Sequence, residues 1–259
     1  MIFDTHAHYD DRDFDGDREE LIESLPLNNV TKVVNVGASI MSSYWCLDLC
    51  HKYDHIYAAI GVHPSDVYLN MDKDLEQLFG FCNDPKVVAI GEIGLDYHFE
   101  DDTDHALQRE YFIKQLYIAQ KLKKSIIIHS RDAAKDTLDI LKENYTGESK
   151  TVMHCFSYSE EVAKEILDMG LYIGVGGVVT FKNARKMVDV VKCMPLERLL
   201  IETDCPYLAP TPHRGKRNSS LYLPLVIEKI SEIRGISPKE IEEITYNNAM
   251  EFYGLSDGE

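Results

Sequence analysis

The sequence lacks any apolar run long enough to cross a membrane. Its longest uncharged apolar stretch, residues 171–181, is about half of the roughly 20 residues that a transmembrane helix requires. No basic segment followed by an apolar run stands at the N-terminus, where residues 2–4 already have the pattern of a strand. We therefore expect no membrane partner, no secretory signal and a cytoplasmic location.

Cysteine pairs at redox or structural-zinc spacing are also missing. The six cysteines, at positions 46, 50, 82, 155, 193 and 205, show no Cys-x-x-Cys spacing, so we expect reduced and mostly buried thiols. Positive charge is scarce too, because 27 Lys and Arg face 44 Asp and Glu, for a net charge of −17. This balance argues against a general nucleic-acid-binding surface, so a polyanionic substrate would need a local basic patch or metal ions.

No Gly-x-Gly-x-x-Gly motif follows a predicted strand, which disfavours dinucleotide binding on an open doubly wound sheet. The cluster Gly174-Val175-Gly176-Gly177 is short, and we interpret it as a tight exit from the seventh predicted strand.

What the chain does contain is a regular alternation of β-branched runs and amphipathic helical patterns. The predicted strands are 2–4, 32–36, 56–60, 87–90, 125–128, 151–153, 172–175 and 199–202. The predicted helices are 18–25, 42–51, 74–82, 105–121, 133–144, 160–169, 183–192, 221–233 and 238–253, with Ser159 and Ser237 as N-caps. Eight such units in this length favour a parallel sheet closed into one α/β domain, a (β/α)8 TIM-type barrel over residues 1–259.

Two histidines, His6 and His8, follow the first predicted strand with a single residue between them. Side chains alternate along a strand, so both imidazoles point the same way. Two neutral imidazoles aimed at one point suit a divalent metal. One such pair is equally consistent with polar residues at a strand end, so the other strand ends have to decide.

Metal-binding side chains recur at the carboxyl ends of other predicted strands, which meet at one mouth of a (β/α)8 barrel. A lone histidine or carboxylate there is usually hydrogen-bonded or caps a helix, but several converging without a metal would be costly. The predicted metal ligands are His6, His8, Glu92, His129, His154 and Asp204.

Four imidazoles and two carboxylates are too many for one tetrahedral ion and fit two divalent cations bridged by a carboxylate and a water. Mixed nitrogen and oxygen ligands accept Zn²⁺, Mn²⁺ or Mg²⁺, and the sequence does not choose among them.

The ordered motifs of the chain resemble those of the TatD family of metal-dependent hydrolases, within the amidohydrolase superfamily. The matching segments are DTHAH at 4–8, GVHP at 61–64, GEIGLDYH at 91–98, IIHSRDA at 127–133, HCFS at 154–157, ETDCPYLAP at 202–210, RGKRN at 214–218 and NNA at 247–249. Each segment alone is weak, whereas the whole set in this order is specific.

The resemblance implies a deformed barrel and a metal-dependent deoxyribonuclease, often a 3′→5′ exonuclease, acting on single-stranded DNA or 3′ ends without an obligate protein partner. Carried over by position, His6, His8 and Asp204 would hold the first metal, His129 and His154 the second, and Glu92 would bridge them. Tyr158 departs from the family pattern, since many relatives have glycine there, and this makes substrate preference the open point.

Two residues at the mouth receive a further role. Asp204 is placed to accept a proton from the attacking water as well as to bind metal. His63 has no ligand role in this scheme, so we assign it to the phosphate or the leaving group; the alternative is a histidine fixed by Pro64 and its loop.

The densest basic cluster of this acidic chain spans residues 212–218. Loops after strands seven and eight often bind phosphate in this fold, so we predict that Arg214, Lys216 and Arg217 contact the nucleic-acid backbone. The alternative is a solvated loop. Arg131 follows a predicted ligand and either reaches phosphate or pairs with Asp132 or another carboxylate.

Two other functions stay open. The same barrel also supports an amidohydrolase acting on a C–N bond, or a hydrolase of small phosphoesters or esters. The basic loop favours a polyanion over these. A non-catalytic binding protein is the other alternative, and the intact ligand set argues against it.

Overall fold

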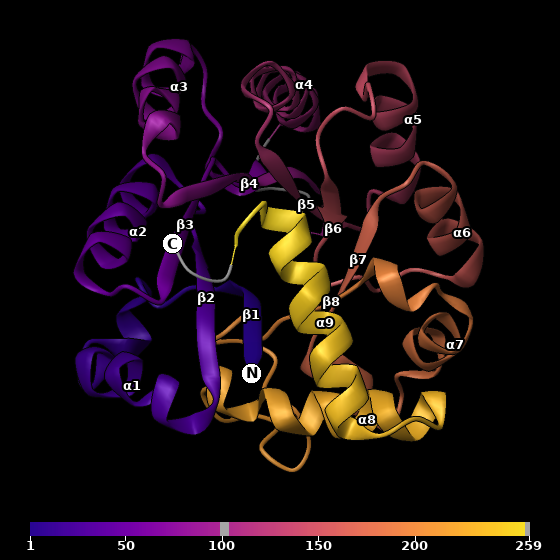
Figure 1. Ribbon diagram of the computed structural model, residues 1–259. Helices are drawn as coiled ribbons and strands as arrows, with labels where there is room; N and C mark the ends of the chain where they lie inside the picture. Colours follow the sequence, from indigo (N-terminus) through magenta and orange to yellow (C-terminus); the bar gives the residue numbers. More distant parts are fainter. Residues whose placement is uncertain (99–103, 257–259) are drawn as a thin grey trace.

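The structure is a computed structural model that describes residues 1–98 and 104–256. Eight parallel strands form one sheet in sequence order, and helices surround it (Figure 1). The strands are β1 (Ile2–Ala7), β2 (Val30–Val36), β3 (Ile56–Ile60), β4 (Val87–Asp96), β5 (Ser125–Arg131), β6 (Thr151–Met153), β7 (Tyr172–Val175) and β8 (Leu199–Ile201). The predicted (β/α)8 barrel is therefore confirmed.

Every predicted helix is present, with ends shifted by no more than a few residues. The helices are α1 (Arg18–Ser24), α2 (Ile40–Lys52), α3 (Asp72–Phe79), α4 (His105–Leu122), α5 (Ala134–Asn144), α6 (Glu160–Asp168), α7 (Arg185–Cys193), α8 (Leu223–Arg234) and α9 (Pro238–Tyr253). Ser237 caps α9 by accepting a hydrogen bond from the backbone N–H of Glu240. Ser159 is the N-cap residue of α6, as predicted, although its side chain makes no capping hydrogen bond to the helix backbone.

Four strands, β1, β2, β4 and β5, are longer than predicted, and in three of them the extra residues include predicted metal ligands. β1, β4 and β5 run on through His6, Glu92 and His129, which lie within strands rather than after them. Along the extended ladder Gly94 pairs with His129. A neighbouring strand supplies the backbone partners that keep these polar residues extended, which local composition does not reveal.

The barrel closes through a backbone bridge between Ala7 at the end of β1 and Cys205, which follows β8. The His8 N–H donates to the carbonyl of Cys205 at 2.8 Å, and the Asp204 N–H donates to the carbonyl of His6 at 2.9 Å. The backbone of the first predicted ligand pair is thus hydrogen-bonded directly to the chain around the last one.

A buried carboxylate reinforces this seam. Asp4 is fully buried and accepts hydrogen bonds from the backbone and hydroxyl of Thr203, at 3.0 and 2.7 Å, and from the hydroxyl of Ser220 at 2.6 Å. Burial raises the pKa of Asp4 to about 6, even though these hydrogen bonds favour its charged form. The side chain joins β1 to both the residues after β8 and the loop before α8.

One end of the barrel is closed by α9, the yellow helix that crosses it in Figure 1. Phe3 of β1 packs against Tyr246 and Tyr253 of α9, with ring centroids 6.3 and 5.6 Å apart. The Tyr253 hydroxyl donates to the carbonyl of Thr5 at 2.7 Å. Each buried ring of this size contributes roughly 1.5–3 kcal/mol. The opposite end, where the strands finish, is left for the polar residues.

Four of the six cysteines are buried (Cys46, Cys50, Cys82 and Cys205), Cys155 is half-buried and Cys193 is exposed; all are free thiols. Among the helices of the described ranges, none is both long and apolar enough to span a bilayer.

The ladder between β4 and β5 requires glycine at position 94. Gly94 has a φ of +146°, and a Cβ there would lie 1.9 Å from the carbonyl oxygen of His129. We expect Gly94→Ala to lower the free energy of unfolding by about 2–5 kcal/mol, through backbone strain and overpacking. The measurement is denaturant unfolding.

The matched control is Gly80→Ala, because a Cβ at Gly80 meets nothing within 4 Å. Its backbone is helical, so we expect a change within about 1 kcal/mol. Equal stability of the two variants would contradict the close approach at Gly94.

Candidate metal centre

Four predicted ligands gather where β1 meets the end of β8. The Nε2 atoms of His6 and His8 lie 3.1 Å apart, and Oδ1 of Asp204 is 3.7 Å from the first and 3.3 Å from the second. The carboxylate of Glu92 lies 3.9 Å from both nitrogens. Ligands held about 2.1 Å from one ion in tetrahedral geometry are roughly 3.4 Å apart. His6, His8 and Asp204 therefore have the spacing of one cation's ligands, with the Glu92 carboxylate beside them, and we name these four residues site A.

The other predicted ligands form a second group on the far side of Glu92. Oε2 of Glu92 lies 2.8 Å from Nε2 of His154 and 3.4 Å from Nδ1 of His129, and these two nitrogens are 3.2 Å apart. We name Glu92, His129 and His154 site B. Glu92 belongs to both sites, as a bridging carboxylate would.

The nitrogen and oxygen atoms of sites A and B do not satisfy one another by hydrogen bonding. Oε2 of Glu92 is buried and has no hydrogen bond in acceptable geometry, although imidazole nitrogens surround it. Glu92 is 5% exposed and His6 is 1% exposed. An unpaired buried carboxylate oxygen costs several kcal/mol, and divalent cations between the ligands would remove that cost. The donor set of sites A and B therefore suits metal ions.

The pKa values of the centre show the same mutual dependence. Burial alone would lower the pKa of His8 and His129, but the neighbouring carboxylates outweigh it. A hydrogen bond that His8 donates to Asp204, together with the charge of Glu92, raises the pKa of His8 to about 10. A hydrogen bond that His129 donates to Asp96, together with the charge of Glu92, raises the pKa of His129 to about 9. Both imidazoles would hold protons at neutral pH that a cation must displace, so acid opposes metal binding.

Asp96 stands behind His129, and the sequence analysis did not single it out. Its Oδ2 lies 3.0 Å from Nε2 of His129, and its Oδ1 accepts from the backbone N–H of His98 at 2.9 Å. The side-chain amide of Gln108 holds the Asp96 backbone at both N–H and C=O, each at 2.9 Å. A carboxylate behind a ligating imidazole orients the ring and raises its basicity.

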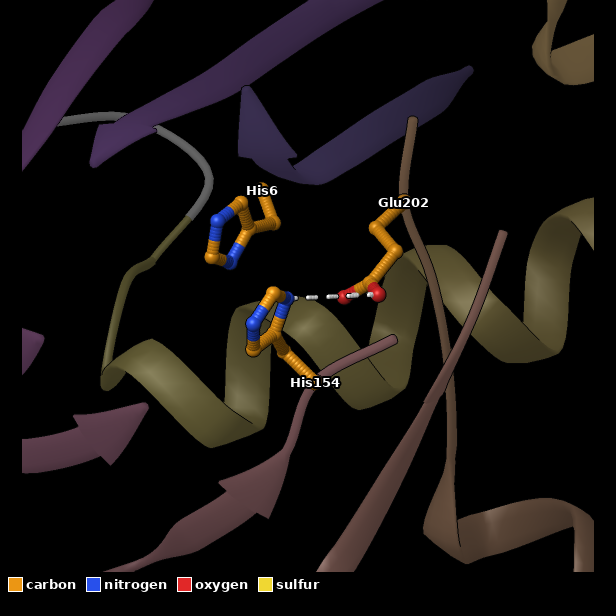
Figure 2. Close-up of side chains that lie close together, drawn as sticks. All are labelled: His6, His154 and Glu202. Atoms are coloured by element: carbon orange, nitrogen blue, oxygen red, sulfur yellow. Dashed lines mark ion pairs between the residues drawn. The ribbon is translucent and has the colours of Figure 1, made fainter. Parts of the chain in front are cut away.

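Glu202 stands behind His154 in a similar way. Figure 2 shows its carboxylate turned toward the His154 ring, and Oε1 lies 3.8 Å from Nδ1. The ring of His6 stacks on His154 with centroids 4.0 Å apart. Burial raises the pKa of Glu202 to about 7. Position 174 of β7 must be small, because a Cβ on Gly174 would lie 2.4 Å from Oε2 of Glu202.

Strand alternation was the signal that could have found Asp96, which lies four residues after Glu92 on β4. Even spacing places the two on one face of an extended chain. The predicted fourth strand ended at residue 90 and cut that pattern short. Glu202 lies just beyond the end of β8 and two residues before Asp204, so its closeness to that predicted ligand was the signal for it.

A cavity of about 660 Å³ opens above the two sites. Its walls include the predicted ligands other than His6, together with His63, Arg131, Tyr207 and Leu208. The ring of His63 lies 4.2 Å from that of His129, between centroids. Its Nδ1 accepts a hydrogen bond from the Ser65 N–H at 3.1 Å. Burial, together with the charge of His129, lowers the pKa of His63 to about 4. A neutral His63 therefore carries its proton on Nε2.

The predicted substrate contacts differ in position. Arg131 lines the cavity, and Asp132 pairs with His98 at 2.8 Å. Arg214 and Lys216 lie on an exposed loop outside the cavity wall, with the Arg214 guanidinium 4.4 Å from the ring centroid of Phe181.

Two residues face away from the cavity. Arg217 donates two hydrogen bonds to the carboxylate of Asp17, at 2.7 and 2.6 Å, so it anchors its loop to the start of α1. The Tyr158 hydroxyl bonds to Ser130 at 2.9 Å and accepts from the Ala133 N–H at 3.2 Å. Tyr158 therefore supports the loop after β5, and it does not line the cavity.

Comparisons with known proteins agree with this architecture. A model of the family described as TatD related DNase matches residues 3–254. An uncharacterized metal-dependent hydrolase of Bacillus subtilis, YabD, is 44% identical over 256 residues, which cover 99% of this chain and 100% of the relative. The solved structure of YjjV, a TatD homolog from Escherichia coli, superposes with a TM-score of 0.91 at 32% identity and 98% coverage of both chains. A TatD family hydrolase from Entamoeba histolytica gives 0.86 at 26% identity, with 99% coverage of each chain.

The position of Asp96 predicts a selective effect on metal affinity. Asp96→Asn keeps the shape of the side chain and removes the charge behind His129. We expect the affinity for one of two divalent ions to fall about 10- to 100-fold, with the other little changed. Calorimetric titration of metal-stripped protein with Zn²⁺ or Mn²⁺ measures both steps.

Asp84→Asn is the matched control, since Asp84 faces the imidazole of His51 at 2.6 Å outside the metal centre. It should leave both binding steps unchanged. If both metal-binding steps of Asp96→Asn match those of the wild type, Asp96 does not support metal binding at site B.

Proposed function

Because the chain belongs to the TatD family of metal-dependent hydrolases, we propose that it is a deoxyribonuclease that removes nucleotides from the 3′ ends of single-stranded DNA. The observation that carries this proposal is the pair of ligand groups that share Glu92 beneath one open cavity. The spacing of this pair suits a phosphodiester, whose charge is neutralised and whose attacking water is activated at two-metal sites. Arg131 on the cavity wall adds a positive charge beside them.

Six side chains would hold the two cations. His6, His8 and Asp204 serve the first, His129 and His154 the second, and Glu92 both. When bound, Zn²⁺, Mn²⁺ or Mg²⁺ would supply Lewis-acid activation of water and of the phosphate. The protein would turn one nitrogen of each imidazole inward and hold Glu92 as an anion, and the cations would displace the protons that His8 and His129 carry at neutral pH. Burial alone would raise the pKa of Glu92, but the charge of His154 and the close imidazole nitrogens of His129 and His154 lower it well below its ordinary value.

The remaining groups handle protons and the substrate. Asp204 lines the cavity with its carboxylate 3.3 Å from His8, and it would accept the proton of the attacking water. His63 presents an Nε2–H donor, since its Nδ1 is occupied by Ser65, so it would donate to a phosphate oxygen or to the leaving oxygen. Arg131 would bind a non-bridging phosphate oxygen.

Metal dependence is the first test of this function. Chelation followed by dialysis should abolish hydrolysis of end-labelled single-stranded DNA, and adding back one divalent ion should restore it. Glu92→Gln should lose activity and at least one metal per chain by elemental analysis, because a neutral amide cannot bridge two cations. A panel of amides, esters and small phosphoesters tests the alternative substrates in the same preparation.

Glu165→Gln is a suitable control, since Glu165 pairs with Lys142 on the helical surface. It should keep metals and activity. Undiminished hydrolysis of DNA after verified metal removal would rule out the proposed mechanism. Hydrolysis of an amide, with none of DNA, would show that the enzyme is an amidohydrolase and not a deoxyribonuclease.

A separate measurement distinguishes Asp204 as proton acceptor from Asp204 as ligand. Asp204→Asn keeps an oxygen donor but cannot accept a proton at neutral pH. We expect metal content to fall modestly while kcat falls about 10²-fold or more. Both quantities are measured on one preparation at saturating metal. If kcat follows metal content in proportion, Asp204 is a ligand only; if kcat is unchanged, the base lies elsewhere.

A further inference from the structure

Two segments of this acidic chain carry basic residues and no acidic ones. Residues 176–188 and 205–227 contain six Lys or Arg and no Asp or Glu, whereas the whole chain has 44 acidic residues. The first segment leads from β7 into α7 and the second from β8 into α8. The basic residues are Lys182, Arg185, Lys186, Arg214, Lys216 and Arg217.

The fold brings these two segments into direct contact. The Thr211 N–H donates to the hydroxyl of Thr180 at 2.8 Å, and the Arg214 guanidinium lies over the ring of Phe181. A Cβ on Gly177 would lie 2.2 Å from the carbonyl oxygen of Leu208, so the two backbones touch there. The loops after β7 and β8 therefore form one continuous surface.

This surface begins at the wall of the metal cavity. Val178 from the first loop and Tyr207 and Leu208 from the second line the cavity. Tyr207 is 53% exposed, and its hydroxyl donates to Asp11 at 2.9 Å, which fixes the ring at the rim. Exposed aromatic and aliphatic groups beside a basic groove are the features on which unpaired bases stack.

Most of these basic side chains are exposed and could contact a ligand. Within the described ranges, Lys182, Lys186 and Lys216 are exposed and have no carboxylate within ion-pair distance. Arg185 has a side chain 94% exposed and lies 3.9 Å from Asp189, a weak pair on the surface. Arg217 is the exception, because its guanidinium is held by Asp17.

We propose that Lys182, Arg185, Lys186, Arg214 and Lys216 form a basic track that binds the phosphodiester backbone of a single DNA strand whose end lies in the metal cavity. This proposal rests on the proposed nuclease function and deepens it, since it makes the preferred substrate a chain of several nucleotides. In a protein of net charge −17, the track is a local patch of positive charge, which would attract a polyanion. The bases of the strand would turn toward Tyr207 and Leu208 at the rim.

The test removes the α7 side of the track, which lies outside the cavity wall. The variant combines Lys182→Ala, Arg185→Ala and Lys186→Ala. The probe is a labelled phosphorothioate oligothymidylate of about 12 nucleotides, which resists hydrolysis and matches common single-strand site sizes. We expect its affinity for the metal-loaded protein to fall about 10-fold or more. The slope of log affinity against log salt should become shallower by about 0.7 per lost phosphate contact.

Hydrolysis provides the second readout. The ratio of kcat/KM for an ordinary oligothymidylate to that for bis(p-nitrophenyl) phosphate should fall about 10-fold in the track variant. The matched control replaces Lys121, Lys142 and Lys192 by Ala, since these lysines lie in the last turns of α4, α5 and α7, at the other end of the barrel. Thermal unfolding checks that both variants fold, and the single change Lys186→Gln replaces the triple one if that variant does not.

The outcomes separate the track from the nuclease function. Track-dependent binding without hydrolysis of DNA by the wild type would keep the track and overturn the nuclease. Hydrolysis of DNA with the track variant equal to the control would keep the nuclease and overturn the track. If the track variant lost more affinity for oligouridylate than for oligothymidylate, the track would bind RNA in preference to DNA, and the proposal of a DNA strand would be overturned.

Discussion

The closure of the barrel between β1 and β8 is the constraint on which the rest of the structure depends. A backbone bridge joins Ala7 of β1 to Cys205, beyond the end of β8, and buried Asp4 ties the same seam to Thr203. Because the strands meet there, residues almost two hundred positions apart, His6 and Asp204, become neighbours. Site A exists only in the closed barrel, so folding and metal binding are physically coupled.

The carboxylates and imidazoles at the mouth of the barrel shift one another's pKa values. Glu92 is buried among imidazoles; nearby carboxylates raise the pKa values of His8, His129 and His154 against the effect of burial, whereas burial and neighbouring imidazoles lower that of His6. Asp96 and Glu202 extend the arrangement outward behind His129 and His154. Asp204 itself has a left-handed backbone, with φ of 56°, a conformation that costs of order 1–3 kcal/mol and is kept by its surroundings. The side chains of the centre are therefore held in a largely buried arrangement whose donor set suits cations, in a chain whose net charge is −17.

Some features of the fold and of the metal centre could be predicted from the sequence, and others could not. The alternation of strands and helices could be predicted, because periodicity is a local property of the sequence. The six ligands could be predicted as a set, because barrel strands share one mouth. The ends of β4 and β5 could not, since they depend on pairing with each other, and Asp96 was therefore missed. Arg217 was predicted to contact the nucleic-acid backbone, but its guanidinium is bound by Asp17, a partner that no pattern in the sequence indicates. The bond of Tyr158 to Ser130 has no sequence pattern either.

The sequence by itself determined the fold class, the order of the elements and the types of side chain available at the strand ends. Those follow from hydrophobic periodicity and from the chemistry of histidine and carboxylate. Only the tertiary structure decided which nitrogen of each imidazole faces Glu92, which carboxylates stand behind His129 and His154, and which arginines are occupied. It also decided that the loops after β7 and β8 touch. The physical reason is that such contacts join residues far apart in the chain, and their geometry is set by packing, which leaves no periodic trace in the sequence.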